Sequence, residues 1–213
     1  METDRRVYQY LAANLSGKSG EIVDRYSKRI AVFSDLPERL DIGEIELKSK
    51  LWDYLDEAIA GGITTLYTGL SYGADSAAAE FFTIRKQQNR NIRIVHITAS
   101  QNWLQETDPA LRGFAAGTLR NNTDYTRSVS GKATGQSGMA RDRFIIDQCL
   151  HIVLLADFSD SFEDSYVWKL LDYAVTPRNN SISHQIHIIS CRDEQRIQHE
   201  TQKKCEPVQG SLF

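Results

Sequence analysis

Residues 64–82 read TTLYTGLSYGADSAAAEFF, and this stretch decides the fold class that we predict for the chain. It begins as a short apolar strand, turns through Gly69 and Gly73, and continues as an alanine-rich helix. Glycine permits a tight turn and a close approach of the backbone to another group. The amides at the start of such a helix favour an anion such as phosphate. The stretch is typical of a nucleotide-binding turn, and the alternative is an ordinary strand–helix turn with a good cap. Its spacing is not GxGxxG, so the usual dinucleotide fingerprint is absent.

The same alternation of strand and helix continues on both sides of this stretch. Short, continuously apolar strands are usually buried on both faces, and strands that alternate with helices pair in parallel. We therefore predict the α/β class, as a single Rossmann-like three-layer domain with a mostly parallel sheet of about five or more strands. The polar residues 99–137 are expected to form an irregular segment over the site, with a helix near 109–116. The expected strands are 29–33, 64–68, 92–97, 152–156 and 186–190, and the expected helices are 44–60, 74–89, 139–149 and 166–175.

The composition of the 213 residues is that of an ordinary globular protein, with 41% hydrophobic and 25% charged residues. It excludes collagen-like, fully disordered and disulfide-scaffold classes. The formal net charge of −3 gives no indication of nucleic-acid binding or of an anionic membrane, although a local basic patch is compatible with nucleic acid. We expect a helical leader over 1–27, the Rossmann-like domain over 28–192 and a polar tail over 193–213.

The cysteines and the apolar runs predict a cytoplasmic protein without a metal site. Cys149, Cys191 and Cys205 are far apart in the sequence and form no CxxC motif, which disfavours both a disulfide framework and a zinc site. The N-terminus lacks the apolar region of a secretory signal. No apolar run approaches the ~18 residues that a membrane span needs, so no membrane partner is predicted.

Polar residues follow two other predicted strands. Ser34 and Asp35 end the first strand, and Asp157 ends the strand 152–156. Because the carboxyl ends of parallel strands meet at one edge of a sheet, we expect these residues beside the glycine turn. There they are candidates for contacts to a ribose or a base, and the alternative is that they are plain turn residues.

The segment GMARDRFIIDQC, residues 138–149, enters the last helix before the strand 152–156. Arg141 is suited to bidentate contacts with a phosphate, and Asp142 is suited to orienting a ribose hydroxyl or a water molecule. The alternative is a solvated helix start with one surface ion pair. For an enzyme, Glu80 or Asp142 would activate water at an N-glycosidic bond.

Together, TGLSYGADSAAAEFF, MARDRFIIDQC and HIVLLAD resemble the YpsA-like branch of the SLOG superfamily over residues 29–190. That superfamily of Rossmann-like proteins also includes the LOG phosphoribohydrolases and the DNA-processing protein DprA. The resemblance implies a pocket for a nucleotide or nucleotide-derived ligand between the glycine turn and the helix that carries Arg-Asp. The PGGxGT segment of the LOG proteins is missing, which disfavours a cytokinin-type phosphoribohydrolase. The residues to which the resemblance extends are Gly69, Ser71, Gly73, Ala74, Asp75, Glu80, Arg141 and Asp142.

These observations predict a bacterial protein that binds or senses a nucleotide-derived small molecule, whose identity and any further cofactor the sequence leaves open. The alternative is an N-glycosidase or phosphoribohydrolase-like enzyme with Glu80 and Asp142 as its catalytic residues. A homodimer is compatible with the sequence but not decided by it. The predicted ligand-binding residues are Ser34, Asp35, Gly69, Ser71, Tyr72, Gly73, Ala74, Asp75, Arg141 and Asp157.

The tail ends in QGSLF, residues 209–213, which resembles the short peptide by which bacterial proteins dock on the replicative sliding clamp. An apolar Leu212–Phe213 anchor after a polar tether suits the docking of an extended peptide into a pocket. Gln209, Leu212 and Phe213 are therefore candidate partner-binding residues, and the alternative is a tail whose Phe213 packs on the domain.

Deletion of residues 209–213 is expected to abolish capture of the protein by an immobilised sliding clamp, because the apolar anchor is then missing. The measurement is a pull-down of the full-length and the shortened protein at equal concentration. Undiminished capture of the shortened protein would contradict the docking hypothesis.

Overall fold

The computed structural model describes residues 26–35, 40, 42–71, 73–102, 117, 122–129, 137–156, 165–176 and 184–191. They form one six-stranded sheet in the order β4-β3-β2-β1-β5-β6, and every strand pair described is parallel. The strands are β1 (Arg29–Ser34), β2 (Thr65–Thr68), β3 (Arg93–Thr98), β4 (Tyr125–Ser128), β5 (His151–Ala156) and β6 (Gln185–Ser190). The helices of this part of the chain are α2 (Glu44–Ala60), α3 (Ala74–Gln88), α6 (Ser137–Gln148) and α7 (Tyr166–Val175).

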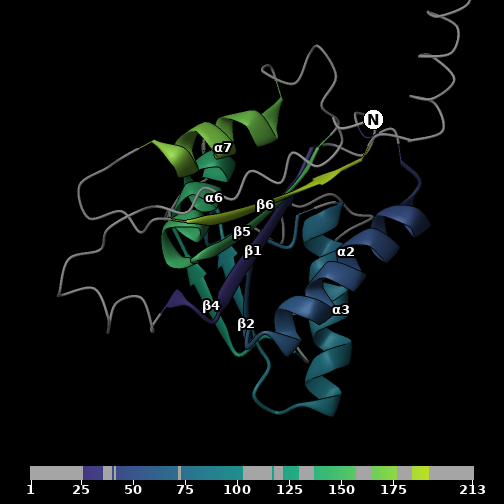
Figure 1. Ribbon diagram of the computed structural model, residues 1–213. Helices are drawn as coiled ribbons and strands as arrows, with labels where there is room; N and C mark the ends of the chain where they lie inside the picture. The colour runs from purple at the N-terminus through teal and green to yellow at the C-terminus, as the bar shows by residue number, and fades with distance from the viewer. Residues whose placement is uncertain are drawn as a thin grey trace, which may run out of the picture.

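The sheet lies between two helical layers, with α2 and α3 on one face and α6 and α7 on the other (Figure 1). Side chains alternate between the faces of a strand. In β1, Ile30 and Val32 therefore join the core under α2 and α3, whereas Ala31 and Phe33 join the core under α6 and α7. This arrangement confirms the predicted α/β class with a Rossmann-like three-layer architecture and a parallel sheet.

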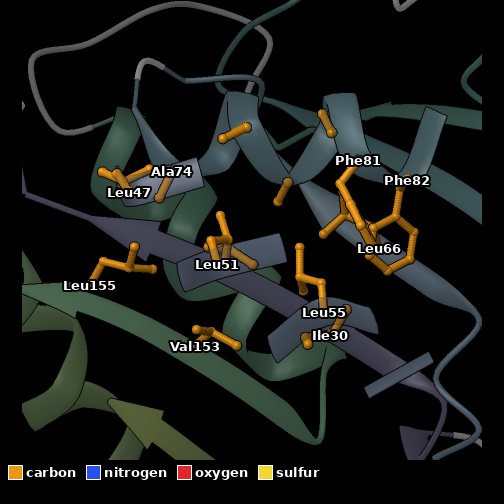
Figure 2. Close-up of a cluster of buried hydrophobic side chains, with 14 of the residues drawn as sticks. Ile30, Leu47, Leu51, Leu55, Leu66, Ala74, Phe81, Phe82, Val153 and Leu155 are labelled. Carbon is orange, nitrogen blue, oxygen red and sulfur yellow. The ribbon is translucent and has the colours of Figure 1, made fainter. Parts of the chain in front are cut away.

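Helix α2 lies on the sheet through a stripe of leucines. Leu47, Leu51 and Leu55 recur at every fourth position and are all buried, with Leu51 and Leu55 at 0% exposure. Figure 2 shows Leu55 beside Ile30 of β1, and Leu47 beside Ala74 of α3. The alanines of α3 leave little side-chain bulk between the helices, so the layer packs closely.

Residues 99–137 differ from the prediction, because β4 forms within them. Tyr125, Thr126 and Arg127 are exposed, so this edge strand lacks the apolar character that marks a buried strand. The predicted bounds of 44–60 and 166–175 are confirmed without change, and the other predicted elements shift by one or two residues. The predicted helix near 109–116, the leader up to residue 25 and the tail lie outside the described residues. In the part that the structure describes, no helix is long and apolar enough to cross a membrane.

The strand order places a topological switch point between β1 and β5. From β1 the chain moves outward through β2, β3 and β4, and it then returns to β5 on the other side of β1. In open parallel sheets, ligands bind outside the carboxyl ends of the strands at such a point. The carboxyl ends of β1 and β5 are therefore where the fold favours a site.

Replacing the fully buried Leu51 by alanine is expected to lower the free energy of unfolding by about 2–5 kcal/mol, because it leaves a cavity between α2 and the sheet. Urea denaturation followed by circular dichroism measures this change. Ile45→Ala on the same helix is the control, since Ile45 is 87% exposed and its loss should change the unfolding free energy by about 0.5 kcal/mol or less. Equal losses in the two variants would contradict the packing described.

Candidate functional site

Buried polar side chains gather at the carboxyl edge of the sheet. Among the buried polar residues of the described chain, only His184 lies elsewhere, and His96 borders the edge beside Thr68. Such groups need hydrogen-bond partners to be tolerated in the interior. Their concentration at one edge marks it as the candidate functional site. The residues are Asp35, Thr68, Asp75, Thr98, Ser100, Ser137, Arg141, Asp142 and Ser165.

The Asp75 carboxylate holds the glycine turn from the first turn of α3. One of its oxygens accepts a hydrogen bond from the Thr68 hydroxyl at 2.5 Å. The other accepts from the amides of Gly69, at 3.1 Å, and Ser71, at 2.8 Å. Successive amides of a turn form an anion-binding concavity, and here a side chain of the protein occupies it. The amides of Gly69 and Ser71 therefore donate to Asp75 and are not free to bind a ligand phosphate.

The two glycines of the turn are required for different reasons. At Gly69 an added Cβ would lie 2.5 Å from the Arg141 guanidinium carbon, so the close approach is made by a side chain of the protein itself. Gly73 has φ +85°, and its Cβ would lie 2.8 Å from the Ser34 hydroxyl oxygen. Between them, Leu70 adopts φ 49°, which is uncommon for a branched side chain. The turn is therefore strained as well as tightly packed.

Arg141 and Asp142 are buried together at the start of α6. The Arg141 Nε donates to Asp142 at 2.6 Å. One terminal nitrogen of the guanidinium donates to the Ser71 hydroxyl at 2.7 Å, and the other lies 3.5 Å from the Gly69 carbonyl oxygen. The second oxygen of Asp142 accepts from the Tyr166 hydroxyl at 2.6 Å. The pair is thus an internal connection between α6, α7 and the glycine turn, not a solvated ion pair.

Asp35, at the end of β1, fixes the start of α7. Its Oδ1 accepts the amides of Tyr166 at 3.0 Å and Val167 at 3.2 Å. The Ser165 hydroxyl caps the same helix by accepting the Trp168 amide at 3.0 Å. A carboxylate is favourable at a helix N-terminus because of the helix dipole. Asp35 thus ties α7 to the switch point.

Burial changes the ionisation of the groups around the turn. It raises the pKa of Asp75 to about 6, against the opposing effects of the Thr68 hydrogen bond and the Arg141 charge. Burial, reinforced by Arg141, lowers the pKa of His96 to about 4. At neutral pH Asp75 is therefore ionised and His96 is neutral. As the pH falls from about 6.5 to about 4, His96 destabilises the fold and Asp75 stabilises it, so the two effects oppose each other.

Ion pairing and burial also affect the Arg141–Tyr166 connection. Burial by itself lowers the pKa of Arg141, but the charge and hydrogen bond of Asp142 more than offset this, so the guanidinium stays protonated. Burial and the adjacent Asp142 raise the pKa of Tyr166, so its phenol stays neutral and donates. Among the residues that the structure describes, no cluster of His, Cys, Asp and Glu could hold a metal ion.

The structure brings most of the predicted ligand-binding residues to one edge. Glu80, which was predicted as a catalytic residue, has no side-chain hydrogen bond or ion pair with the described residues of this edge. Its carboxylate forms an ion pair with Lys48 of α2 at 3.0 Å. Tyr72, Asp157 and the tail residues Gln209, Leu212 and Phe213 lie outside the described residues. The residues brought together are Ser34, Asp35, Gly69, Ser71, Gly73, Ala74, Asp75, Arg141 and Asp142.

Thr68, Tyr166 and His96 are among the residues of this edge that were not predicted from the sequence. The sequence gives a weak indication of Thr68, since it is the last strand residue before Gly69. It gives no indication that Tyr166 and His96 lie at this edge, because their positions depend on contacts between elements far apart in the chain. Tyr166 meets Asp142 24 residues away, and His96 pairs in register with Thr68.

No protein-family model matches the sequence, and no curated protein matches it. Among solved structures, the chain is similar to DNA processing protein A from Helicobacter pylori, whose structure was described for its single-stranded DNA binding mode. The two share 13% sequence identity with a TM-score of 0.45, over 87% of this chain and 84% of that chain. This likeness is too distant to assign a family or a function.

Asp75→Ala is expected to lower the free energy of unfolding by about 2–4 kcal/mol, because the amides of Gly69 and Ser71 and the Thr68 hydroxyl lose their acceptor. Formate should restore part of this loss, since a small carboxylate fits the position that the side chain vacated. The measurement is thermal unfolding with formate and with chloride at equal ionic strength. Leu51→Ala is the control, and a similar formate effect on both variants would contradict the assigned role of Asp75.

Proposed function

We propose that the chain binds a nucleotide or nucleotide-derived ligand at the carboxyl edge of β1, β2 and β5. The observation that carries the proposal is the convergence of buried polar groups on the switch point of a parallel α/β sheet. The backbone at Leu70 supports it, since strained conformations are found preferentially at binding and catalytic sites. The resemblance of the sequence to the YpsA-like branch of the SLOG superfamily agrees with this proposal.

We place the anionic group of the ligand at the N-terminus of α3. The N-cap of that helix is Gly73, which contributes no side-chain cap. Gly73, Ser71 and Ser76 are only partly buried, so solvent reaches this end of the helix. The helix dipole favours an anion there, and the backbone groups of a helix start suit a phosphate. The turn beneath, held by Asp75 and Arg141, would act as a rigid base for the ligand.

The contacts of the carboxylates favour binding over hydrolysis. Both oxygens of Asp142 are engaged, by Arg141 and by Tyr166, and a general base needs an oxygen that reaches the attacking water. Glu80 pairs with Lys48 and lies partly exposed between α2 and α3. A ligand that is bound and left unchanged is therefore the expected outcome, and the N-glycosidase remains the alternative.

Ser76→Asp is expected to weaken nucleotide affinity about tenfold or more, because it places a negative charge in the first turn of α3 where the phosphate is proposed to lie. The added carboxylate is favourable at this end of a helix, but the Ser76 hydroxyl donates to the Ser71 carbonyl oxygen, so the unfolding free energy of the variant is measured beside its affinity. Ser49→Asp, an equal charge change at an exposed position in α2, is the control and should bind as the unchanged protein does.

The measurement is native mass spectrometry with nucleoside monophosphates, ADP, ATP, NAD, ADP-ribose, cyclic dinucleotides and a short DNA oligomer, followed by calorimetry on any ligand retained. The same samples are checked for released base. Release of base would replace the binding proposal by the hydrolase. Retention of none of these compounds, or equal affinity in the two variants, would contradict the proposed site.

A further inference from the structure

We propose that Tyr166 is a positioning residue of this edge, which sets the conformation of the glycine turn from α7 without being part of it. The glycine turn here means residues 69–71 and 73. The connection runs from the phenol through Asp142 and Arg141 to Ser71 and Gly69. Its consequence for a ligand rests on the proposed function, whereas its consequence for the turn does not.

The first link is the contact of Tyr166 with Asp142. Asp142 is 3% exposed, and each of its oxygens accepts one hydrogen bond of 2.6 Å, from the Tyr166 hydroxyl and from the Arg141 Nε. A buried carboxylate that loses a hydrogen-bond donor raises the free energy of the folded state, because no water molecule replaces the donor. Removing the phenol oxygen would therefore shift Asp142, and with it the guanidinium that it holds.

The second link is the contact of Arg141 with the turn. Its guanidinium carbon lies where a side chain at position 69 would begin, at 2.5 Å from an added Cβ. One terminal nitrogen donates to the Ser71 hydroxyl, and the other lies 3.5 Å from the Gly69 carbonyl oxygen. Because this packing leaves no room, a shift of the guanidinium must displace the turn.

The third link is that the turn is held from two sides. From α3, Asp75 accepts the amides of Gly69 and Ser71, and from α6, Arg141 contacts the same two residues. Loss of the second support leaves the first, so the turn should loosen rather than unfold. Its amides should then open to solvent more often.

The start of α7 is well placed to act on this connection. The Tyr166 amide donates to Asp35 at the end of β1, while the phenol of the same residue donates to Asp142 of α6. One residue thus joins the switch point to the glycine turn. A partner or ligand that moves the first turn of α7 would change the turn at the proposed phosphate position.

The test compares Tyr166→Phe with Tyr173→Phe. Both tyrosines lie on α7 and donate to an aspartate of α6, Tyr166 to Asp142 at 2.6 Å and Tyr173 to Asp147 at 2.9 Å. Each variant loses one hydroxyl of the same kind, but only Tyr166 is connected to Arg141. Amide hydrogen exchange at Gly69 and Ser71, measured by NMR on the ligand-free protein, should be about tenfold faster in Tyr166→Phe and unchanged in Tyr173→Phe.

Unchanged exchange at the two amides in Tyr166→Phe, or an equal increase in both variants, would overturn the proposal. Arg141→Lys provides a second measurement, because the shorter reach of its single ammonium group breaks the same connection. In the double variant, Tyr166→Phe should add little to the exchange rate that Arg141→Lys already gives, and full additivity would also overturn the proposal.

Ligand binding is then measured separately. Where a nucleotide is retained, Tyr166→Phe should weaken its affinity about fivefold and Tyr173→Phe should leave it unchanged. If no nucleotide binds the unchanged protein but exchange at Gly69 and Ser71 still responds to Tyr166→Phe, the proposed function fails and the positioning role stands. If a nucleotide binds and exchange does not respond, the positioning role fails and the proposed function stands.

Discussion

The buried charge of Arg141 is the constraint on which the carboxyl edge depends. A guanidinium at 8% exposure must be neutralised and hydrogen-bonded, or the fold loses several kcal/mol. Asp142 supplies the countercharge, and the residues of the glycine turn supply the remaining acceptors. The need for Gly69 follows from this, because the guanidinium occupies the space of a side chain at that position. The conformation of the turn is thus a consequence of where one cation is buried.

The edge holds more carboxylates than the cation Arg141 can neutralise, and backbone amides stabilise the remaining negative charge. Asp75 accepts two amides of the turn and Asp35 accepts two amides at the start of α7. Amides at turns and helix starts carry partial positive charge, so they stabilise ionised oxygens without a second cation. The edge is therefore fixed mainly by hydrogen bonds of the protein to itself, and its polar groups are already oriented before a ligand arrives.

Local patterns predicted the architecture well but the contacts poorly. The apolar side of the segment and the glycines at positions 61 and 62 defined the helix 44–60, and the apolar runs defined every buried strand. The strand 125–128 was missed because an exposed edge strand has no apolar signal. The pattern also predicted that Arg141 and the glycine turn lie at one edge, and it left open whether they contact a phosphate or only other residues of the protein. In the structure Arg141 contacts Ser71 and Asp142, and the turn contacts Asp75, because residues far apart in the chain satisfy one another.

Because the polar groups of the edge already bind one another, they restrict how the ligand proposed above would be recognised. Since Asp75 holds the amides of Gly69 and Ser71, a phosphate gains no hydrogen bonds from them unless Asp75 gives them up. In the proposed site, recognition would then fall to the amides of α3 after Ala74, whose own amide donates to the Ser34 hydroxyl, and to the hydroxyl groups around them. Such a site adds few new bonds, and its affinity depends on how little reordering the turn needs on binding. In the proposed site, the rigidity given by the buried network would therefore be as important to binding as the groups that touch the ligand.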